Sequence, residues 1–189
     1  TPGIRKFALA AHLTISVGWI GTVVAYVALG VTAVRSENAL MVRSAWMAME
    51  LIGWYVIVPA ALLSLLTGLV MALGTKSGLF RYYWVLFSLV LTIVATVVLI
   101  LHMPTVSFLA DAAQGAEAGA LESLGSDLLH PGLGLVVLLV ILGLNVFKPE
   151  GLTRYGRRKQ YEHRSGLQQA MKAPVPHPDQ GTVRRPADV

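Results

Sequence analysis

Four long runs of apolar residues divide the chain, and each is bounded by segments rich in charge, glycine or proline. The runs cover about residues 7–34, 45–73, 82–103 and 128–147. A helix needs about 20 apolar residues to cross a bilayer, and all four runs reach that length. Apolar positions within them do not alternate with polar ones, which favours helices over strands. The pattern predicts an all-α protein whose residues 1–148 form a four-helix transmembrane bundle.

The composition agrees with this prediction. Of the 189 residues, 55% are hydrophobic and only 13% are charged, whereas about 25% are charged in a soluble domain. The chain has no cysteine, which excludes disulfides, thiolate zinc sites, iron–sulfur clusters and covalent c-type haem. The first run is too long for a removed signal peptide and lacks a small-residue cleavage site, so we interpret it as the first span.

The basic residues predict how the chain threads the membrane. All fifteen Lys and Arg residues except Arg35 and Arg43 lie in the N-terminal segment, the second connection or the tail. Short segments rich in Lys and Arg stay in the cytoplasm, so both termini are expected there. The expected location is the bacterial cytoplasmic (inner) membrane. Because these residues are confined to such segments, they favour the lipid bilayer as partner and no nucleic acid.

Two polar segments flank the fourth span. The predicted outer loop, residues 105–127, carries four acidic residues and no basic one. Within it, residues 116–124 favour a short surface helix, and Asp127 is expected to cap the fourth span. The tail, residues 149–189, is basic and then proline-rich without a periodic apolar face. It is predicted to be disordered on its own, with its first half suited to anionic headgroups.

Each predicted span carries one stripe of small and polar residues, and these stripes are expected to face one another. Pro59 predicts a kink in the second span. The threading brings Glu50, His102 and His130 to the outer boundary, whereas His12 lies near the cytoplasmic boundary. The candidate neighbours of His12 are Ser64, Thr67, Ser88 and Asn145.

The outer residues fit several kinds of site. His102 and His130, on neighbouring antiparallel helices, are candidate axial ligands of a b-type haem, and Gly132 and Gly134 would leave room for it. With Glu50, the same two histidines would form a His₂Glu site for a divalent metal, and Met103 would add a soft ligand for copper. Each histidine also fits a boundary residue that points to water.

Two residues have structural alternatives. Glu50 also fits an ion pair with Arg43 or Arg35 at the outer interface, or a proton-coupled carboxylate of a transporter. His12 fits either a cofactor ligand or a packing residue whose nitrogens are hydrogen-bonded.

The stretch HLTISVGWIG, which begins at His12, resembles the H-x-x-x-x-x-x-W-x-G pattern of small four-span bacterial membrane proteins. PAALLSLLTGL from Pro59 and RYYWVLFSLVLT from Arg81 continue the resemblance over roughly residues 7–110. The group includes the membrane protoporphyrinogen oxidases and the copper-resistance D-type proteins. The chain is most similar to uncharacterised actinobacterial members.

The resemblance has implications for two positions of this chain. In the oxidase family the histidine that matches His12 is a haem ligand, so the resemblance implies haem at that residue. The other essential residue of that family is a lysine, and it matches a position at or beside Ser88, where this chain has no lysine.

The sequence therefore predicts a small integral membrane protein that is not itself an enzyme. We expect a subunit or accessory of a larger membrane complex or a homo-oligomer, carrying b-type haem between the third and fourth spans. One alternative is a haem- or metal-dependent membrane oxidoreductase that uses His12. Another is a small proton-coupled transporter. No ATP-binding loop, nucleophile triad or dinucleotide fingerprint is present in the sequence.

Overall fold

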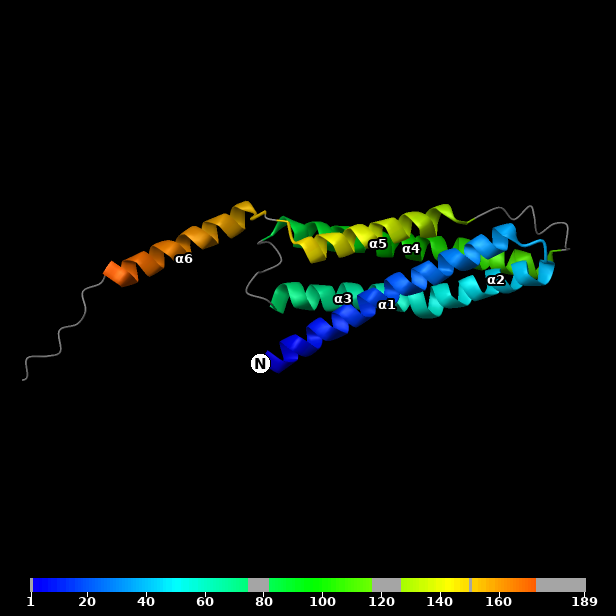
Figure 1. The fold of residues 1–189 in the computed structure, drawn as a ribbon, viewed down its shortest axis with the longest axis horizontal. Helices are drawn as coiled ribbons and strands as arrows, with labels where there is room; N and C mark the ends of the chain where they lie inside the picture. The colour runs from blue at the N-terminus through cyan, green and yellow to red at the C-terminus, as the bar shows by residue number, and fades with distance from the viewer. Residues whose placement is uncertain (1, 75–81, 117–126, 150, 173–189) are drawn as a thin grey trace, which may run out of the picture.

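The computed structural model describes residues 2–74, 82–116, 127–149 and 151–172, and these residues form a helical bundle (Figure 1). The elements in order are α1 (Pro2–Arg35), α2 (Ala39–Ile52), the π-helical turn η1 (Gly53–Ile57), α3 (Val58–Gly74), α4 (Tyr83–Gly115), α5 (Leu129–Phe147) and α6 (Arg154–Lys172). Since α2, η1 and α3 follow one another without a break, they make one long helical rod. The described residues contain no strand, only one isolated bridge between Tyr82 and Leu152.

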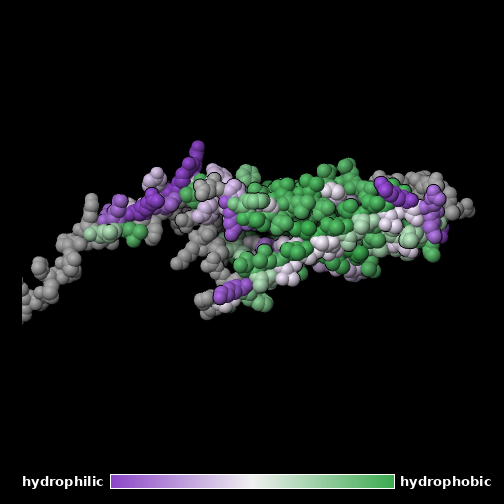
Figure 2. All heavy atoms as spheres, viewed as in Figure 1, coloured by the Kyte–Doolittle hydropathy of each residue, from purple (hydrophilic) through white to green (hydrophobic). Residues whose placement is uncertain are grey.

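Among the described residues, four helical stretches are long and apolar enough to cross a membrane. They are Lys6–Arg35, Ala39–Leu73, Tyr83–Gly115 and Leu129–Phe147. Figure 2 shows hydrophobic residues over the side of this bundle and hydrophilic residues at its two ends and along α6. The prediction of an all-α four-helix bundle is confirmed, and the chain is a multi-pass membrane protein.

The two ends of the bundle differ in what they carry. The N-terminus and α6 lie at the same end, which we call the inner end after the orientation that the basic residues predict (Figure 1). The connection between α1 and α2 lies at the opposite end, which we call the outer end. The end of α4 and the start of α5 are also found there.

Helix α4 is longer than the sequence predicts. The third span was expected to end near Met103, but the helix continues through Pro104 to Gly115, so residues 105–115 of the expected outer loop are helical. Val106, Ala110 and Ala113 in this extension are each fully buried. Packing of these side chains against the bundle outweighs the loss of the backbone hydrogen bond that Pro104 cannot donate. The expected short helix at 116–124 falls almost entirely outside the described residues.

The second rod also starts earlier than expected. Helix α2 begins at Ala39, about two turns before the predicted residue 45. Asn38 caps it, because its side-chain oxygen accepts hydrogen bonds from the backbone N–H groups of Leu40 and Met41 at 3.0 and 3.3 Å. The Asn38 cap therefore starts the helix before the continuous apolar run that begins at about residue 45.

Regular α-helical bonding in this rod is interrupted at η1, directly before Pro59. The backbone N–H of Val58 donates to the carbonyl of Gly53, five residues back, as in a π-helix. Gly53 also admits α4 closely, since a Cβ added there would lie 2.6 Å from Cε of Met103. The irregular turn thus lies where the Met103 side chain of α4 packs directly on the backbone of the second rod.

The hydrophobic core lies mainly in the outer half of the bundle. Its largest fully buried side chains are Trp46, Met49, Met103 and Val106. Towards the inner end, the buried positions include the hydroxyl residues Ser64 and Ser88. The outer half is thus sealed by large apolar side chains, and the inner half is lined in part by polar ones.

Helix α6 contradicts the expectation of a disordered tail over its first half. Residues Arg154–Lys172 are helical and extend away from the inner end of the bundle (Figure 1). A Glu one turn after an Arg supports such a helix, and Arg158 Nε lies 3.2 Å from Glu162 Oε1. The proline-rich residues 173–189 lie outside the described residues.

Candidate functional site

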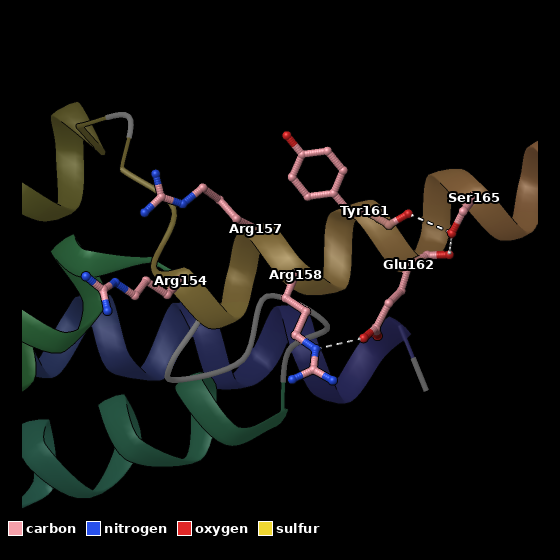
Figure 3. A pocket seen from close by; sticks show the side chains of 6 residues that line it. All are labelled: Arg154, Arg157, Arg158, Tyr161, Glu162 and Ser165. Atoms are coloured by element: carbon pink, nitrogen blue, oxygen red, sulfur yellow. Dashed lines mark hydrogen bonds and ion pairs between the residues drawn. The ribbon is translucent and has the colours of Figure 1, made fainter.

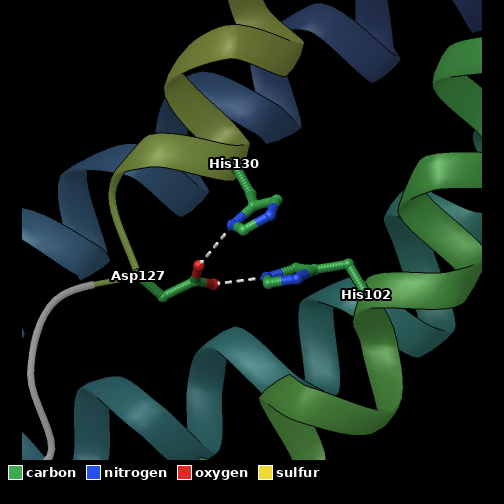
Figure 4. A group of neighbouring side chains, drawn as sticks. All are labelled: His102, Asp127 and His130. Carbon is green, nitrogen blue, oxygen red and sulfur yellow. Dashed lines mark hydrogen bonds and ion pairs between the residues drawn. The ribbon is translucent and has the colours of Figure 1, made fainter.

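Three side chains meet at the outer end of the bundle, where α4 and α5 come together (Figure 4). Nε2 of His102 lies 2.7 Å from Oδ2 of Asp127, and Nδ1 of His130 lies 3.4 Å from Oδ1 of the same carboxylate. The imidazole rings are stacked, with centroids 4.1 Å apart and planes inclined by 19°. The two histidines that the sequence predicts as partners therefore do meet, with an aspartate between them.

The local fold explains how Asp127 reaches both rings. Leu128, the next residue, packs so closely on α1 that a Cβ added at Gly30 would lie 2.9 Å from its Cδ2. This contact fixes the start of α5, and His130 then lies three residues after Asp127. Asp127 lies just before the helix, and one of its carboxylate oxygens faces His130 while the other faces His102 on α4.

Asp127 does not have the capping role expected from the sequence. Leu128 is the N-cap residue of α5, and no side chain caps that helix end. The Asp127 carboxylate is engaged by the histidines instead. Its side chain is only 6% exposed, compared with 15% for His102 and 53% for His130. The group is thus buried at the carboxylate and open to the outside at His130.

This arrangement has the chemistry of a divalent-metal site. One ligand atom from each of the three residues can be chosen so that all three atoms lie within 4.8 Å of one another. Atoms that share a zinc ion lie about 3 to 3.5 Å apart, because Zn–N and Zn–O distances are about 2.0 to 2.2 Å. To reach that spacing, His102 would move slightly away from Asp127 and exposed His130 would move towards the shared ion. Two imidazoles and a carboxylate also leave a position free for water or substrate.

The ring geometry favours this metal hypothesis over the haem hypothesis. Axial ligands of a haem point their nitrogens at the iron from opposite faces of the macrocycle. Here the rings stack on each other at 4.1 Å, and each directs one nitrogen to Asp127. A macrocycle between them would require both rings to turn and separate. A Cβ added at Gly132 or Gly134 meets no described atom within 4 Å, so these glycines face open space.

Two further predicted ligands lie elsewhere. Glu50 does not belong to the group of close ligand atoms found among the described residues, and Asp127 takes the place expected for it. The expected ion pair of Glu50 is also absent from the described part of the chain, where Arg43 donates instead to the carbonyl of Ala116. Met103 is 1% exposed, and its sulfur packs against Gly53 in the core.

His12 lies at the inner end of the bundle, apart from the outer group. Its Nδ1 is 2.9 Å from Oγ1 of Thr67, and its ring packs on Gly68, where an added Cβ would lie 3.2 Å from Cε1. Of the expected neighbours, Thr67 therefore contacts the ring. Ser64 pairs with Ser16 at 2.9 Å.

The remaining expected neighbours of His12 bond to each other. The amide of Asn145 lies 3.4 Å from Oγ of Ser88, which links α5 to α4. These polar residues border a cavity of about 1450 Å³ between α1, α3, α4 and α5. The cavity was not predicted from the sequence, although Ser64, Ser88 and Asn145, which line it, were named there as neighbours of His12.

A second hollow, of about 700 Å³, lies along α6 (Figure 3). Three arginines line it, with Tyr161, Glu162 and Ser165. All of its lining residues belong to one exposed helix, and Arg158 is already paired with Glu162. No other described element closes over it, so it is a weaker candidate than the two sites in the bundle.

No family model, no curated protein and no solved structure matches this chain. Its function is therefore inferred from the geometry of these sites.

Proposed function

We propose that this multi-pass membrane protein binds a divalent transition-metal ion at its outer end, through His102, Asp127 and His130. The observation that carries the proposal is the sharing of one buried carboxylate by two imidazoles from different helices. Three donor atoms already gathered within 4.8 Å require little rearrangement to close on an ion. The proposal keeps two of the three predicted ligands and replaces Glu50 with Asp127.

The donor set favours particular ions. Imidazole nitrogen suits zinc, copper, iron and nickel, whereas magnesium and calcium prefer oxygen ligands. Affinity is expected to rise from Co²⁺ to Cu²⁺ and to fall again at Zn²⁺, as for most nitrogen and oxygen sites. The ion would take the place of the hydrogen bond between His102 and Asp127.

Cobalt and zinc provide the direct test. Protein purified in detergent and stripped with chelator should take up one Co²⁺ per chain and develop the intense visible absorption of a four-coordinate site. Zn²⁺ should displace the cobalt and remove that absorption. His102→Ala and Asp127→Ala should each lower the Zn²⁺ affinity by at least about 100-fold, since loss of even an outer-shell partner costs about 10- to 100-fold.

A matched control is available in Glu50. Glu50→Gln removes a nearby carboxylate from the same end of the bundle but no proposed ligand, so its metal affinity should equal that of the wild type. If Glu50→Gln abolishes binding while Asp127→Asn does not, the ligand set is wrong. If all forms take up no metal, the three residues serve only to join α4 to α5.

We also propose that the protein acts as an accessory of a larger assembly in a bacterial inner membrane. Helix α6 supports this role. It stands outside the bundle, and its Tyr161, Leu167 and Met171 side chains are 73%, 53% and 86% exposed. Apolar side chains on an exposed basic helix are typical of a surface that binds another protein chain or the membrane face.

Copurification tests the accessory role. The protein, tagged and expressed in its native host, should retain other membrane chains in mild detergent. Leu167→Ser with Met171→Ser should release them, whereas Val136→Ser with Val140→Ser, which changes two exposed positions on α5, should not. A wild-type protein that purifies alone and as a monomer would contradict this role without bearing on the metal site.

A further inference from the structure

The inner half of the bundle contains a cavity that the metal site does not use. It occupies about 1450 Å³ between α1, α3, α4 and α5, and most of its lining residues are aliphatic or aromatic. Small-molecule sites usually measure about 300 to 1,000 Å³, so this cavity has room for a large ligand. Leu13 and Val17 of α1 line it and are 52% and 60% exposed, so it is open along the side of the bundle.

Charge is distributed unevenly around the cavity. Lys148 and Arg157 line it at the inner end, and no Asp or Glu is among the described residues that line it. Lys148 is also the one non-glycine residue of the described chain with a positive φ, at φ 42° and ψ 63°. A left-handed residue often ends a helix, as Lys148 ends α5. With two cations and no described acidic residue in its lining, the rim of the cavity is cationic.

The depth of the cavity matches one leaflet of a bilayer. On α5 its wall runs from Leu138 to Lys148, ten residues, which corresponds to about 15 Å of helix. The hydrocarbon core of a bilayer is about 30 Å thick, so half of it is about 15 Å. With a cationic rim at one end and an apolar wall one leaflet deep, the cavity complements a membrane lipid with an anionic headgroup.

A buried donor without a partner lies in the same wall. Trp19 lines the cavity and is 4% exposed, and its Nε1–H has no hydrogen-bond partner among the described residues. Buried indole N–H groups usually have one. The other polar side chains of the wall are largely satisfied, since Ser16 pairs with Ser64 and Asn145 with Ser88. Trp19 thus leaves one unsatisfied donor in the wall of the cavity.

We propose that this cavity binds a phosphate-bearing anionic lipid of the inner leaflet. The headgroup phosphate lies between Lys148 and Arg157, and the acyl chains follow the apolar wall towards Leu138. This site is separate from the metal site, so either can be absent without the other.

Native mass spectrometry in an uncharged detergent tests the headgroup. The probes are phosphatidylglycerol and phosphatidylcholine with identical acyl chains. Phosphatidylglycerol should bind about 30-fold more tightly, as expected from two cations near an anionic headgroup. Lys148→Gln with Arg157→Gln should bring its affinity to that of phosphatidylcholine. Arg158→Gln with Arg164→Gln removes the same charge from α6 outside the cavity and should change nothing.

A second pair of variants tests the location. Thr92→Phe places a ring in the cavity and should weaken both lipids, whereas Val94→Phe adds the same ring to the exposed side of α4 and should not. Equal affinity for the two lipids in the wild type would overturn the proposal. So would competition by inorganic phosphate at equal concentration, because the ligand would then be a soluble phosphate. Equal losses in Thr92→Phe and Val94→Phe would also overturn it.

Discussion

Asp127 illustrates what a single residue contributes to this protein. A carboxylate of which 6% is exposed is costly to keep charged without partners, and the two imidazoles provide them. The sequence contains half of this arrangement, since Asp127 and His130 are three residues apart at the start of the predicted fourth span. It does not contain the other half, because His102 is 25 residues away from Asp127 and only the packing of α4 on α5 brings them together.

The two histidines should contribute unequally to stability. His102→Ala removes the closer, more buried partner and should lower the free energy of unfolding by about 1 to 3 kcal/mol. His130→Ala removes an exposed partner at 3.4 Å and should cost less than about 1 kcal/mol. Metal-free protein unfolded in detergent, with Asp127→Ala combined with each variant, measures both coupling energies. Equal couplings would contradict the inequality.

The absence of a side chain at Gly53 lets Met103 of α4 pack against the second rod. Gly53→Ala would place a Cβ 2.6 Å from Cε of Met103, which is 1% exposed and has little room to move. The variant should be less stable by about 1 to 3 kcal/mol. Gly134→Ala is the control, because its Cβ meets no described atom within 4 Å. It should be neutral or stabilising by up to about 1 kcal/mol. Thermal unfolding in detergent compares the two, and an equally stable Gly53→Ala would show that α4 moves away freely.

At the scale of elements, α4 is where sequence reasoning falls short. The apolar run gives its start within about one residue, but the predicted end near Met103 is too early, because the helix continues through Pro104 to Gly115. Proline disfavours a helix locally, whereas the burial of Val106, Ala110 and Ala113 favours it through contacts with other helices. The local effect of proline can be read from the sequence. The burial of these side chains cannot, because it depends on which helices are neighbours.

The helical extension of α4 predicts a periodic pattern of reactivity. Since the native chain has no cysteine, single cysteines at positions 105–115 can be labelled one at a time. Cysteines replacing Phe108 and Asp111, which are exposed, should react quickly with a water-soluble maleimide. Cysteines replacing Ala110 and Ala113, which are fully buried, should react at least about tenfold more slowly. Uniform reactivity along the segment would indicate a loop and contradict the helix.

At the scale of the whole molecule, the apolar runs predict the number of spans and the basic residues predict their direction. The four spans are where the sequence places them, apart from the earlier start of α2 and the later end of α4. The cavity is not predictable in this way. It arises because small and polar side chains on α1, α3 and α4 face one another without filling the space, and that depends on the distances between helices.

Cysteine labelling also tests the direction of the whole bundle. In intact cells, a membrane-impermeant maleimide should label Glu37→Cys, which lies in the connection between α1 and α2. It should not label Ser165→Cys on α6 until the membrane is opened, because the basic residues are predicted to keep the inner end in the cytoplasm. Labelling of Ser165→Cys and not Glu37→Cys in intact cells would reverse the orientation and place the metal site inside the cell.

Helix α5 differs from the other spans in how it is held. Leu138 is the only buried residue along it, so few side chains in the middle of α5 are enclosed by other helices. Polar contacts occur near its ends, with His102 and Asp127 at one and Asn145 and Ser88 at the other. A helix held mainly at its two ends can tilt about one contact when the other is broken. An ion in the outer site would therefore restrain the outer end of α5. Because α5 also lines the inner cavity, metal binding at one end of the protein would restrict the motion of the cavity wall at the other.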